Sequence, residues 1–363
     1  MNKKETSICI EGVIYDVAAI RSRHALHQLT PPLGGDVYAA LFAFLVEWFD
    51  SSKTMVGYTS GSTGQAKEIA LNKESMRESA RQTCSFLDLK AGDKALLCLP
   101  LKYIAGKMMV ARSLVAGLDL YCVDSSGHPL KHHDISFDFA AMIPLQVYNS
   151  LSNNIERKQL ASIKNLIIGG ASIDADLETA IKNFPNRVFS TYGMCETLSH
   201  IALRQLNGSK ASANYTPFAS VAISLSDDSC LIIDAPLLCN KVLKTNDIAI
   251  INADGSFRIV GRKDNIINTG GIKIQIEEVE ALIGPLFKKA FAISYVPDKK
   301  FGQVLVLLAQ EEVDRDLLKG LLPAYHFPKK IFLVDTIPTT ENGKIDRVGL
   351  RKIALSESLK ILF

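Results

Sequence analysis

The segment Tyr58–Lys67 carries the strongest chemical signal in this chain of 363 residues. It reads YTSGSTGQAK, which combines two glycines, four serine or threonine hydroxyls and a lysine. Glycine lets the backbone approach a ligand closely, while amides, hydroxyls and the ammonium group donate hydrogen bonds to phosphate. The segment therefore predicts a polyphosphate-binding loop, although such clusters also form ordinary surface loops. It is not a P-loop of the GxxxxGK[ST] type, because Gly64 is followed by Gln65.

Four further motifs place glycines beside residues that could act on a nucleotide. They are Gly169-Gly170-Ala171, the stretch STYGMCET at 190–197, the acid and base Asp247 and Arg262, and Lys344 on a glycine turn within 338–347. Taken singly, each motif also fits a strand-end turn, a surface ion pair or a solvated basic loop. Their chemical interpretation therefore depends on the elements that position them.

Short apolar runs alternate with glycine-bearing loops and helical stretches through the first two thirds of the chain. A helix is expected over Asp36–Ser51, and strands are expected at Ala95–Leu99, Leu118–Val123, Phe139–Ile143, Leu166–Ile168 and Val188–Phe189, with a helix ending near Leu114. This alternation predicts an α/β fold with a doubly wound, mostly parallel sheet. Such sheets bind ligands beyond the carboxyl ends of their strands, which is where the glycine motifs fall.

The pattern changes from about Ser212 to short strands separated by turns. Strands are expected at Cys230–Ile233, Ile248–Ile251 and Phe257–Val260, with a hairpin turn at Asn252–Gly255. A small α+β unit is expected from Asp264, with helices at Ile276–Ile283 and Asp314–Leu322 and strands at Ala290–Val296, Val304–Leu308 and Lys330–Val334. The sequence thus predicts a large N-terminal domain, 1–263, with a short β region, and a C-terminal domain, 264–363.

Composition excludes several classes of protein. With a formal charge of +3 and scattered Lys and Arg, the sequence shows no basic cluster that would indicate nucleic-acid binding. No apolar run is long enough for membrane insertion. Seven cysteines without CxxC spacing indicate a reducing compartment rather than a disulfide or zinc framework. The N-terminus lacks a secretory signal pattern, so a cytoplasmic location is expected. The sequence leaves open whether the protein forms a homodimer.

Together and in this order, the five motifs resemble those of the adenylate-forming superfamily, which includes acyl-CoA synthetases, peptide-synthetase adenylation domains and luciferases. The resemblance covers about Tyr58 to Arg347, and the chain looks shorter than most members ahead of the phosphate loop. It implies a small, mobile C-terminal domain with a hinge at Asp264. It also implies a two-step reaction in which a carboxylic acid reacts with ATP to give an acyl-adenylate, and CoA then displaces AMP.

The resemblance also implies a role for each matching residue. ATP phosphates would be held by Thr59, Ser60, Gly61, Ser62, Thr63, Gly64 and Lys67, and Mg²⁺ by Glu196. Tyr192 would stack on adenine beside the backbone of Gly169, Gly170 and Ala171, with Thr191 and Gly193 also at the nucleotide. Asp247 and Arg262 would hold the ribose, and Lys344 would bridge the acid and the α-phosphate. Rotation about Asp264 would then bring Gly270 and Gly271 toward the path of CoA.

Three positions depart from the superfamily pattern. Cys195 replaces the usual threonine before Glu196, so a hydroxyl to the α-phosphate is replaced by a thiol, which is a weaker donor. Asn246 replaces the usual glycine before the ribose aspartate, and Tyr103 stands where histidine is common. These departures concern the strength of single contacts rather than the class of reaction.

The acid substrate is suggested by three further segments. The runs at 99–117, 141–147 and 196–201 are similar to those of the o-succinylbenzoate–CoA ligases of menaquinone biosynthesis. A dicarboxylate substrate needs a partner for its second carboxylate, and the candidates are Lys102, Lys107 and Arg112. Tyr103 and Ser199 are also expected to contribute to the acid site. Each cation also fits an exposed helix surface. The alternatives are a CoA ligase for another aryl or medium-chain acid, and a non-catalytic homologue that only binds.

Overall fold

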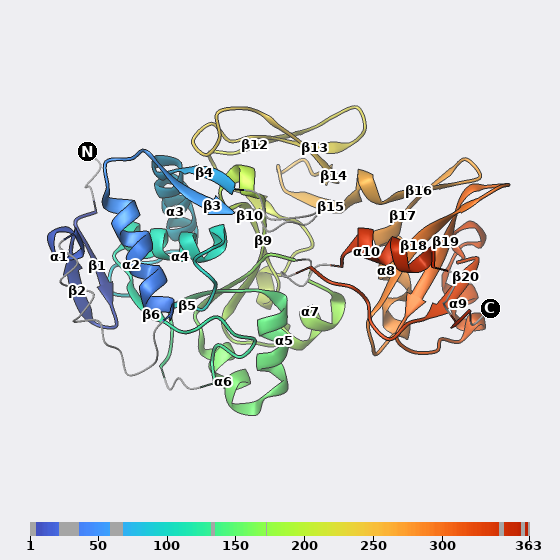
Figure 1. The fold of residues 1–363 in the computed structure, drawn as a ribbon, viewed down its shortest axis with the longest axis horizontal. Coiled ribbons are helices and arrows are strands. Elements are labelled where there is room, and N and C mark those ends of the chain that lie inside the picture. Colours follow the sequence, from blue (N-terminus) through green and yellow to red (C-terminus); the bar gives the residue numbers. More distant parts are fainter. Residues whose placement is uncertain are drawn as a thin grey trace. The chain divides into compact units, whose positions relative to one another are not determined.

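The computed structural model describes residues 5–21, 36–58, 68–131, 135–171, 173–340, 345–356 and 360–361. The described residues form two compact units (Figure 1). The first contains the residues up to Ala222 together with Asp234–Val242, and the second contains Ile223–Ile233 and the residues from Leu243 onward. The second unit therefore also includes the short β region before Asp264, and the predicted domain boundary at 263/264 stays a prediction.

A nine-stranded sheet forms the centre of the first unit. Its order is β11-β10-β9-β8-β7-β5-β6-β1-β2. The strands are β1 (Ser7–Ile10), β2 (Val13–Asp16), β5 (Lys94–Leu97), β6 (Asp119–Cys122), β7 (Phe139–Met142), β8 (Asn165–Ile168), β9 (Arg187–Gly193), β10 (His200–Gln205) and β11 (Thr216–Pro217). From β1 to β9 in this order, all neighbouring strands are parallel. At the two edges of the sheet, β2 pairs with β1, β10 with β9, and β11 with β10, all in antiparallel orientation. The prediction of an α/β fold with a mostly parallel sheet is confirmed.

Helices connect these strands, as the sequence pattern predicts. They are α1 (Val17–Arg21), α2 (Asp36–Phe49), α3 (Lys73–Leu87), α4 (Ile104–Ala116), α5 (Pro144–Ser152), α6 (Asn154–Ser162) and α7 (Ala175–Ile181). Helix α4 packs against β1, β5 and β6 as well as against α3. Its buried residues include apolar ones, such as Met108 and Val110, and also the cations Lys107 and Arg112.

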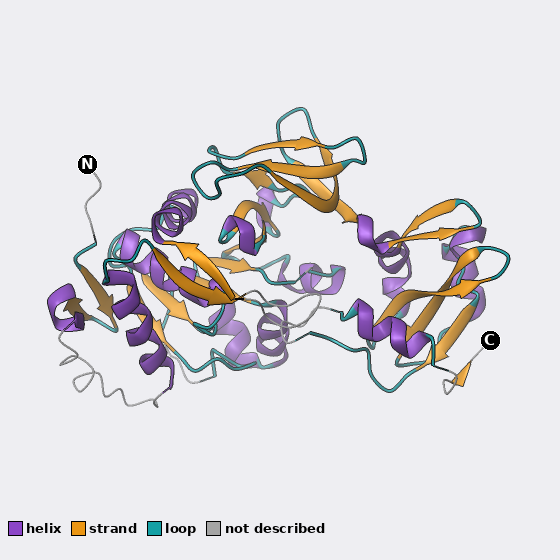
Figure 2. Cartoon of the chain, turned by 45° about the horizontal axis from the view of Figure 1, so that its top comes forward, coloured by secondary structure: helices purple, strands orange, loops and turns teal. Residues whose placement is uncertain are grey.

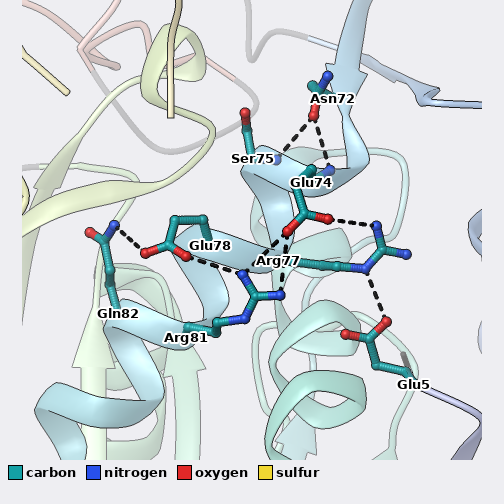
Figure 3. Close-up of polar contacts among 8 residues, drawn as sticks. All are labelled: Glu5, Asn72, Glu74, Ser75, Arg77, Glu78, Arg81 and Gln82. Atoms are coloured by element: carbon teal, nitrogen blue, oxygen red, sulfur yellow. Dashed lines mark hydrogen bonds and ion pairs between the residues drawn. The ribbon is translucent and has the colours of Figure 1, made fainter. Parts of the chain in front are cut away.

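Helix α3 follows a hairpin of β3 (Thr54–Tyr58) and β4 (Glu68–Asn72). The Asn72 side chain accepts hydrogen bonds from the amides of Glu74 and Ser75, which caps the helix (Figure 3). The exposed face of the helix carries ion pairs from Arg77 and Arg81 to nearby glutamates. The opposite face is buried and includes Thr83.

Strand β9 is longer than the sequence predicts. The expected loop from Ser190 to Gly193 is in fact strand, because Thr191 and Tyr192 pair with Leu203 and Ala202 of the antiparallel neighbour β10. The expectation of a loop here was therefore wrong. These residues are strand because they pair with β10, which follows after a turn of the chain. The apolar pattern of β9 alone does not reveal this pairing.

The second unit contains two sheets joined along the chain (Figure 2). The first has the order β12 (Ala222–Leu225), β13 (Cys230–Asp234), β14 (Leu243–Ile251), β15 (Phe257–Arg262). The second contains β16 (Ile266–Thr269), β17 (Ile272–Gln275), β18 (Phe291–Asp298), β19 (Gly302–Ala309), β20 (Lys330–Leu333) and β21 (Lys360–Ile361). Helices α8 (Ile276–Ile283) and α10 (Arg347–Ala354) pack on β18, and α9 (Arg315–Leu321) packs on α8. The predicted α+β character and the predicted hairpin turn at Asn252–Gly255 are confirmed.

Candidate active site

The glycine motif after β8 and the tyrosine motif on β9 lie side by side. The Gly169 amide donates to the carbonyl of Met142 on β7 at 3.1 Å. A Cβ atom at Gly169 would lie 2.3 Å from Thr191 Oγ1, so a side chain there would displace the neighbouring strand. Gly170 has a φ of +89°, a backbone conformation that favours glycine. The two motifs therefore meet at the carboxyl ends of adjacent parallel strands.

Tyr192 has an aromatic neighbour that sequence reasoning missed. Its ring centroid lies 5.8 Å from that of Tyr215, with an interplanar angle of 54°. The Tyr215 hydroxyl forms a 2.9 Å hydrogen bond with Ser190 Oγ, which fixes the position of the second ring. Tyr215 stands in a polar stretch without periodicity, so its sequence context carries no signal for this role.

A short turn presents Glu196 after β9. Residues Cys195–Thr197 form one turn of 3-10 helix, and Leu198 has a φ of +64°. Thr197 is fully buried, where its hydroxyl accepts from the Met194 amide at 3.1 Å and donates to the Ser199 carbonyl at 2.7 Å. The turn is therefore held rigidly while Glu196 itself is exposed.

A single exposed carboxylate suits a magnesium ion that is shared with a ligand. Mg²⁺ is commonly bound by one or two carboxylates together with the phosphates of a substrate. Within the described ranges, no group of three or more His, Cys, Asp or Glu residues could hold a metal alone. Glu196 fits the role of such a shared ligand, and the assignment stays a prediction.

Arg112 is the most unusual charged residue of the first unit. Its side chain lies on α4 and the residue is 2% exposed. Its Nη2 donates to Ser199 Oγ at 2.8 Å, and its Nε is buried and has no hydrogen-bond partner among the described residues. No carboxylate pairs with Arg112 in the part of the chain that the structure describes. Burial lowers the pKa of its guanidinium to about 10, because the charged form loses its hydration inside the protein.

The other two candidate cations lie elsewhere. Lys107 is buried against α2, with its Nζ 5.4 Å from the Phe44 ring centroid, and burial lowers its pKa. Lys102 is exposed, and its Nζ lies 5.5 Å from the ring of Tyr103. Tyr103 occupies the N-cap position of α4, without a capping hydrogen bond from its side chain, and forms a β-bridge with Tyr58 at the end of β3. Of the three candidate cations, Arg112 is the one that bonds to Ser199 in the described structure, and Tyr103 lies where the predicted phosphate loop begins.

The predicted ribose-binding residues form one cluster in the second unit. Asp247 and Arg262 face each other on β14 and β15, and Arg262 Nη1 donates to Asp247 Oδ1 at 2.8 Å. The same guanidinium pairs with Asp264 at 2.9 Å, and the Asn246 amide donates to both oxygens of Asp264 at 3.1 Å. The raised pKa of Arg262 reflects these two carboxylates, which outweigh its partial burial. The predicted hinge residue Asp264 is thus bonded directly to the predicted ribose site.

Gly270 and Gly271 form the turn between β16 and β17. Both have positive φ, +59° and +86°, as a two-residue hairpin of type I′ requires. The Gly270 amide donates to the Phe301 carbonyl at 2.9 Å, and a Cβ at Gly270 would lie 3.0 Å from the Phe301 ring. The turn between β16 and β17 is therefore held in place by Phe301.

The predicted residues Thr59–Gly64, Lys67 and Lys344 lie outside the described residues. The two ends of the segment that carries Lys344 are described. Thr339 pairs with Ile345, and Arg347 binds Glu280 of α8 through two hydrogen bonds of 2.7 Å. These contacts fix the base of that segment to the second unit.

Buried His200, next to Ser199, makes stability depend on pH. Burial, with Arg112 as the charged group that faces the ring in the described structure, holds the pKa of His200 well below its ordinary value of 6.5. Below pH 6.5 the unfolded chain takes up a proton that the folded protein does not, so the free energy of unfolding falls by about 1.4 kcal/mol per pH unit. Denaturant titrations between pH of about 7.5 and 5.5 should show this loss in the wild type and not in His200→Phe. Equal pH slopes in the two proteins would contradict the assignment.

The family of the chain follows from comparison with known proteins. The family model described as AMP-binding enzyme matches residues 46–235. The chain therefore belongs to the AMP-binding enzyme family. The matched range contains the segment predicted to bind phosphate, both strand-end motifs, Arg112 and Ser199. The predicted membership of the adenylate-forming superfamily is confirmed.

The chain is also similar to individual proteins and solved structures. The 2-succinylbenzoate–CoA ligase of Listeria monocytogenes is 26% identical over 347 residues, which cover 85% of this chain and 72% of the relative. The ligase of that name from Escherichia coli is 26% identical over 332 residues, which cover 85% and 71%. Among solved structures, an acyl-CoA synthetase (AMP-forming)/AMP-acid ligase II-like protein from Dyadobacter fermentans is 30% identical, with a TM-score of 0.63 and coverage of 91% and 97%. An O-succinylbenzoate coenzyme A synthetase from Bacillus subtilis shares the fold at 22% identity, with a TM-score of 0.66 and coverage of 82% and 69%.

In the described part of the chain, no helix combines the length and the apolar character that crossing a membrane requires.

Proposed function

We propose that the protein is an AMP-forming acid–CoA ligase that converts 2-succinylbenzoate, ATP and CoA into 2-succinylbenzoyl-CoA, AMP and pyrophosphate. In the first step, a carboxylate oxygen attacks the α-phosphorus of ATP, and pyrophosphate leaves with the electron pair of the broken P–O bond. In the second step, the sulfur of CoA loses its proton and attacks the acyl carbon, and AMP leaves. The relatives named above support this reaction and this acid.

The buried Arg112 is the observation that carries the choice of a dicarboxylate. A cation that is 2% exposed and has no described carboxylate partner needs an anion from a ligand. One carboxylate of the substrate reacts with ATP, and the other can pair with this guanidinium through a planar, bidentate contact. A monocarboxylic acid would leave the cation unpaired. The site therefore favours an acid with two carboxylates.

The remaining predicted residues supply positioning and charge stabilisation. Tyr192 and the backbone at Gly169–Ala171 would hold adenine, and Asp247 with Arg262 would hold the ribose. Lys344 would donate to the reacting carboxylate and the α-phosphate, which reduces repulsion between two anions. Glu196 and the ATP phosphates would hold Mg²⁺, which neutralises phosphate charge when bound. Each of these roles is a proposal for this chain.

Asp247→Ala should raise the KM for ATP strongly. Its carboxylate is mostly buried and is held by Arg262, so removal takes away both a ribose acceptor and the partner that orients the arginine. Loss of a charge-assisted hydrogen bond of this kind costs about 1.5–3 kcal/mol, or about 10–100-fold. Steady-state kinetics at saturating acid give the value, with Asp298→Ala as a control from a turn of the same unit. An unchanged KM for ATP would remove the ribose assignment.

The reaction itself is tested by acid-dependent exchange of labelled pyrophosphate into ATP. We expect exchange with 2-succinylbenzoate and much weaker exchange with either analogue that lacks one of its two carboxylates. Exchange that is equally fast with benzoates or medium-chain fatty acids would support a different acid. Absence of exchange with every carboxylic acid would support a protein that only binds.

A further inference from the structure

We infer that His200 is a positioning residue for acid recognition: together with Thr83 it fixes Ser199 as a hydrogen-bond acceptor and thereby aims Arg112 at the second carboxylate of the substrate. This inference rests on the proposed function, because it assigns Arg112 to the acid. It concerns a residue that lies within the run 196–201 but to which the sequence analysis assigns no role. His200 is 5% exposed and begins β10, directly after the turn that carries Glu196.

The chain of hydrogen bonds begins on α3. Thr83 Oγ1 lies 3.1 Å from the carbonyl of Ser79, one turn earlier in the helix, and 3.0 Å from His200 Nε2. A hydroxyl has one proton, and a carbonyl oxygen can only accept. Both contacts are hydrogen bonds at once if Thr83 donates its proton to Ser79 and accepts from Nε2–H of His200, and we assign them so. This arrangement assigns the neutral Nε2–H tautomer to the imidazole.

The remaining hydrogen bonds, from His200 to Ser199 and Arg112, follow from that tautomer. With its proton on Nε2, His200 Nδ1 is an acceptor, and it lies 3.3 Å from Ser199 Oγ. Ser199 therefore donates to His200 and offers its lone pairs to Arg112, whose Nη2 lies at 2.8 Å. A protonated imidazole would donate at both nitrogens and would place a second positive charge beside Arg112. Burial and this cation oppose such a charge.

The consequence concerns the guanidinium. Arg112 Nη2 donates to Ser199, Nη1 is 3.8 Å from Met109 Sδ, and Nε has no hydrogen-bond partner in the part of the chain that the structure describes. The group is thus oriented by one strong hydrogen bond while other donors stay available for a ligand. Since the orientation depends on Ser199, and Ser199 depends on His200, loss of the imidazole should weaken binding of the acid without affecting ATP.

His200→Phe and His200→Gln separate positioning from packing. Phenylalanine keeps the ring beside Phe218, whose centroid lies 5.6 Å away, but it removes both hydrogen bonds. Glutamine keeps one donor and one acceptor. We expect His200→Phe to raise the KM for 2-succinylbenzoate by about 10-fold, as for loss of one to two hydrogen bonds, with little change in kcat or in the KM for ATP. His200→Gln should restore the KM to within about 3-fold of wild type.

Three controls make the outcome decisive. Thermal unfolding shows that each variant is folded, and His326→Phe in the second unit provides a matched replacement of a histidine outside the cluster. For the analogue that lacks the carboxylate bound by Arg112, His200→Phe should cause no further loss. An unchanged KM for the acid in His200→Phe, an equal loss for acid and ATP, or failure of glutamine to restore binding would each overturn the inference. If the wild-type enzyme uses both monocarboxylate analogues as well as it uses 2-succinylbenzoate, the proposed function is wrong. If the wild-type enzyme prefers 2-succinylbenzoate to the analogues and His200→Phe keeps the same preference, only this inference is wrong.

Discussion

Lys344→Ala is expected to lower the rate of acyl-adenylate formation by about 10²–10³-fold, as for removal of one preorganised donor to a developing charge. Transfer of the acyl group from supplied acyl-adenylate to CoA should be largely unaffected, because the role proposed for Lys344 is confined to the step in which two anions must approach each other. The base of its segment is held by the pairing of Thr339 with Ile345 and by the Arg347–Glu280 ion pair. A local substitution should therefore leave the rest of the second unit intact.

The two half-reactions are measured separately for this variant. Pyrophosphate exchange reports adenylation, and release of AMP from synthetic acyl-adenylate in the presence of CoA reports thiol transfer. Lys352→Ala, an exposed lysine on α10, is the control. Equal losses in both half-reactions would contradict a role that is confined to adenylation and, with it, the rotation of the small domain between steps.

Arg112→Met should have the second large effect, and it should act in opposite directions on function and stability. The KM for 2-succinylbenzoate is expected to rise by about 10²-fold, because a charged hydrogen-bond partner of the substrate is lost. The free energy of unfolding without ligand is expected to rise by about 1–2 kcal/mol, because an apolar side chain of similar length replaces a buried cation with no described carboxylate partner. Kinetics and denaturant titration measure the two effects.

Arg204→Met is the matched control for stability. Arg204 lies in the same unit and is also largely buried, but it is paired with Glu178, and this pairing raises its pKa. Its replacement should therefore destabilise the protein, since a carboxylate loses its partner. A loss of stability in Arg112→Met as large as that in Arg204→Met would show that Arg112 has a partner in the free protein.

Much of the fold could be predicted because the signals are local. Helix α8 is observed at Ile276–Ile283, as its apolar periodicity and acidic first turn predict. The hairpin turn at Asn252–Gly255 is likewise a local signal, and it is observed with Gly255 at a φ of +80°. Strand β9 was underestimated because its last residues are stabilised by β10, and pairing between strands is not encoded in the period of one of them.

The site was harder to predict because its contacts join distant residues. Arg112 and Ser199 are 87 residues apart, and Thr83 and His200 are 117 apart. Sequence reasoning could have separated Lys107 from Arg112, since five residues on a helix correspond to a rotation of about 140°. It could not tell which face meets β10, because that depends on how the helix packs. A role for His200 was missed, although it lies in the run 196–201, because its partner Thr83 is distant in the sequence.

The central claim is that a carboxylic acid is joined to AMP, and isotope transfer tests it most directly. 2-Succinylbenzoate labelled with ¹⁸O in its carboxylates is incubated with ATP, Mg²⁺ and CoA, and the phosphorus products are analysed by mass spectrometry. An acyl-adenylate places one carboxylate oxygen on the α-phosphorus, so one ¹⁸O atom should appear in each AMP released and none in pyrophosphate. Label in inorganic phosphate with formation of ADP, or AMP without label, would contradict the account.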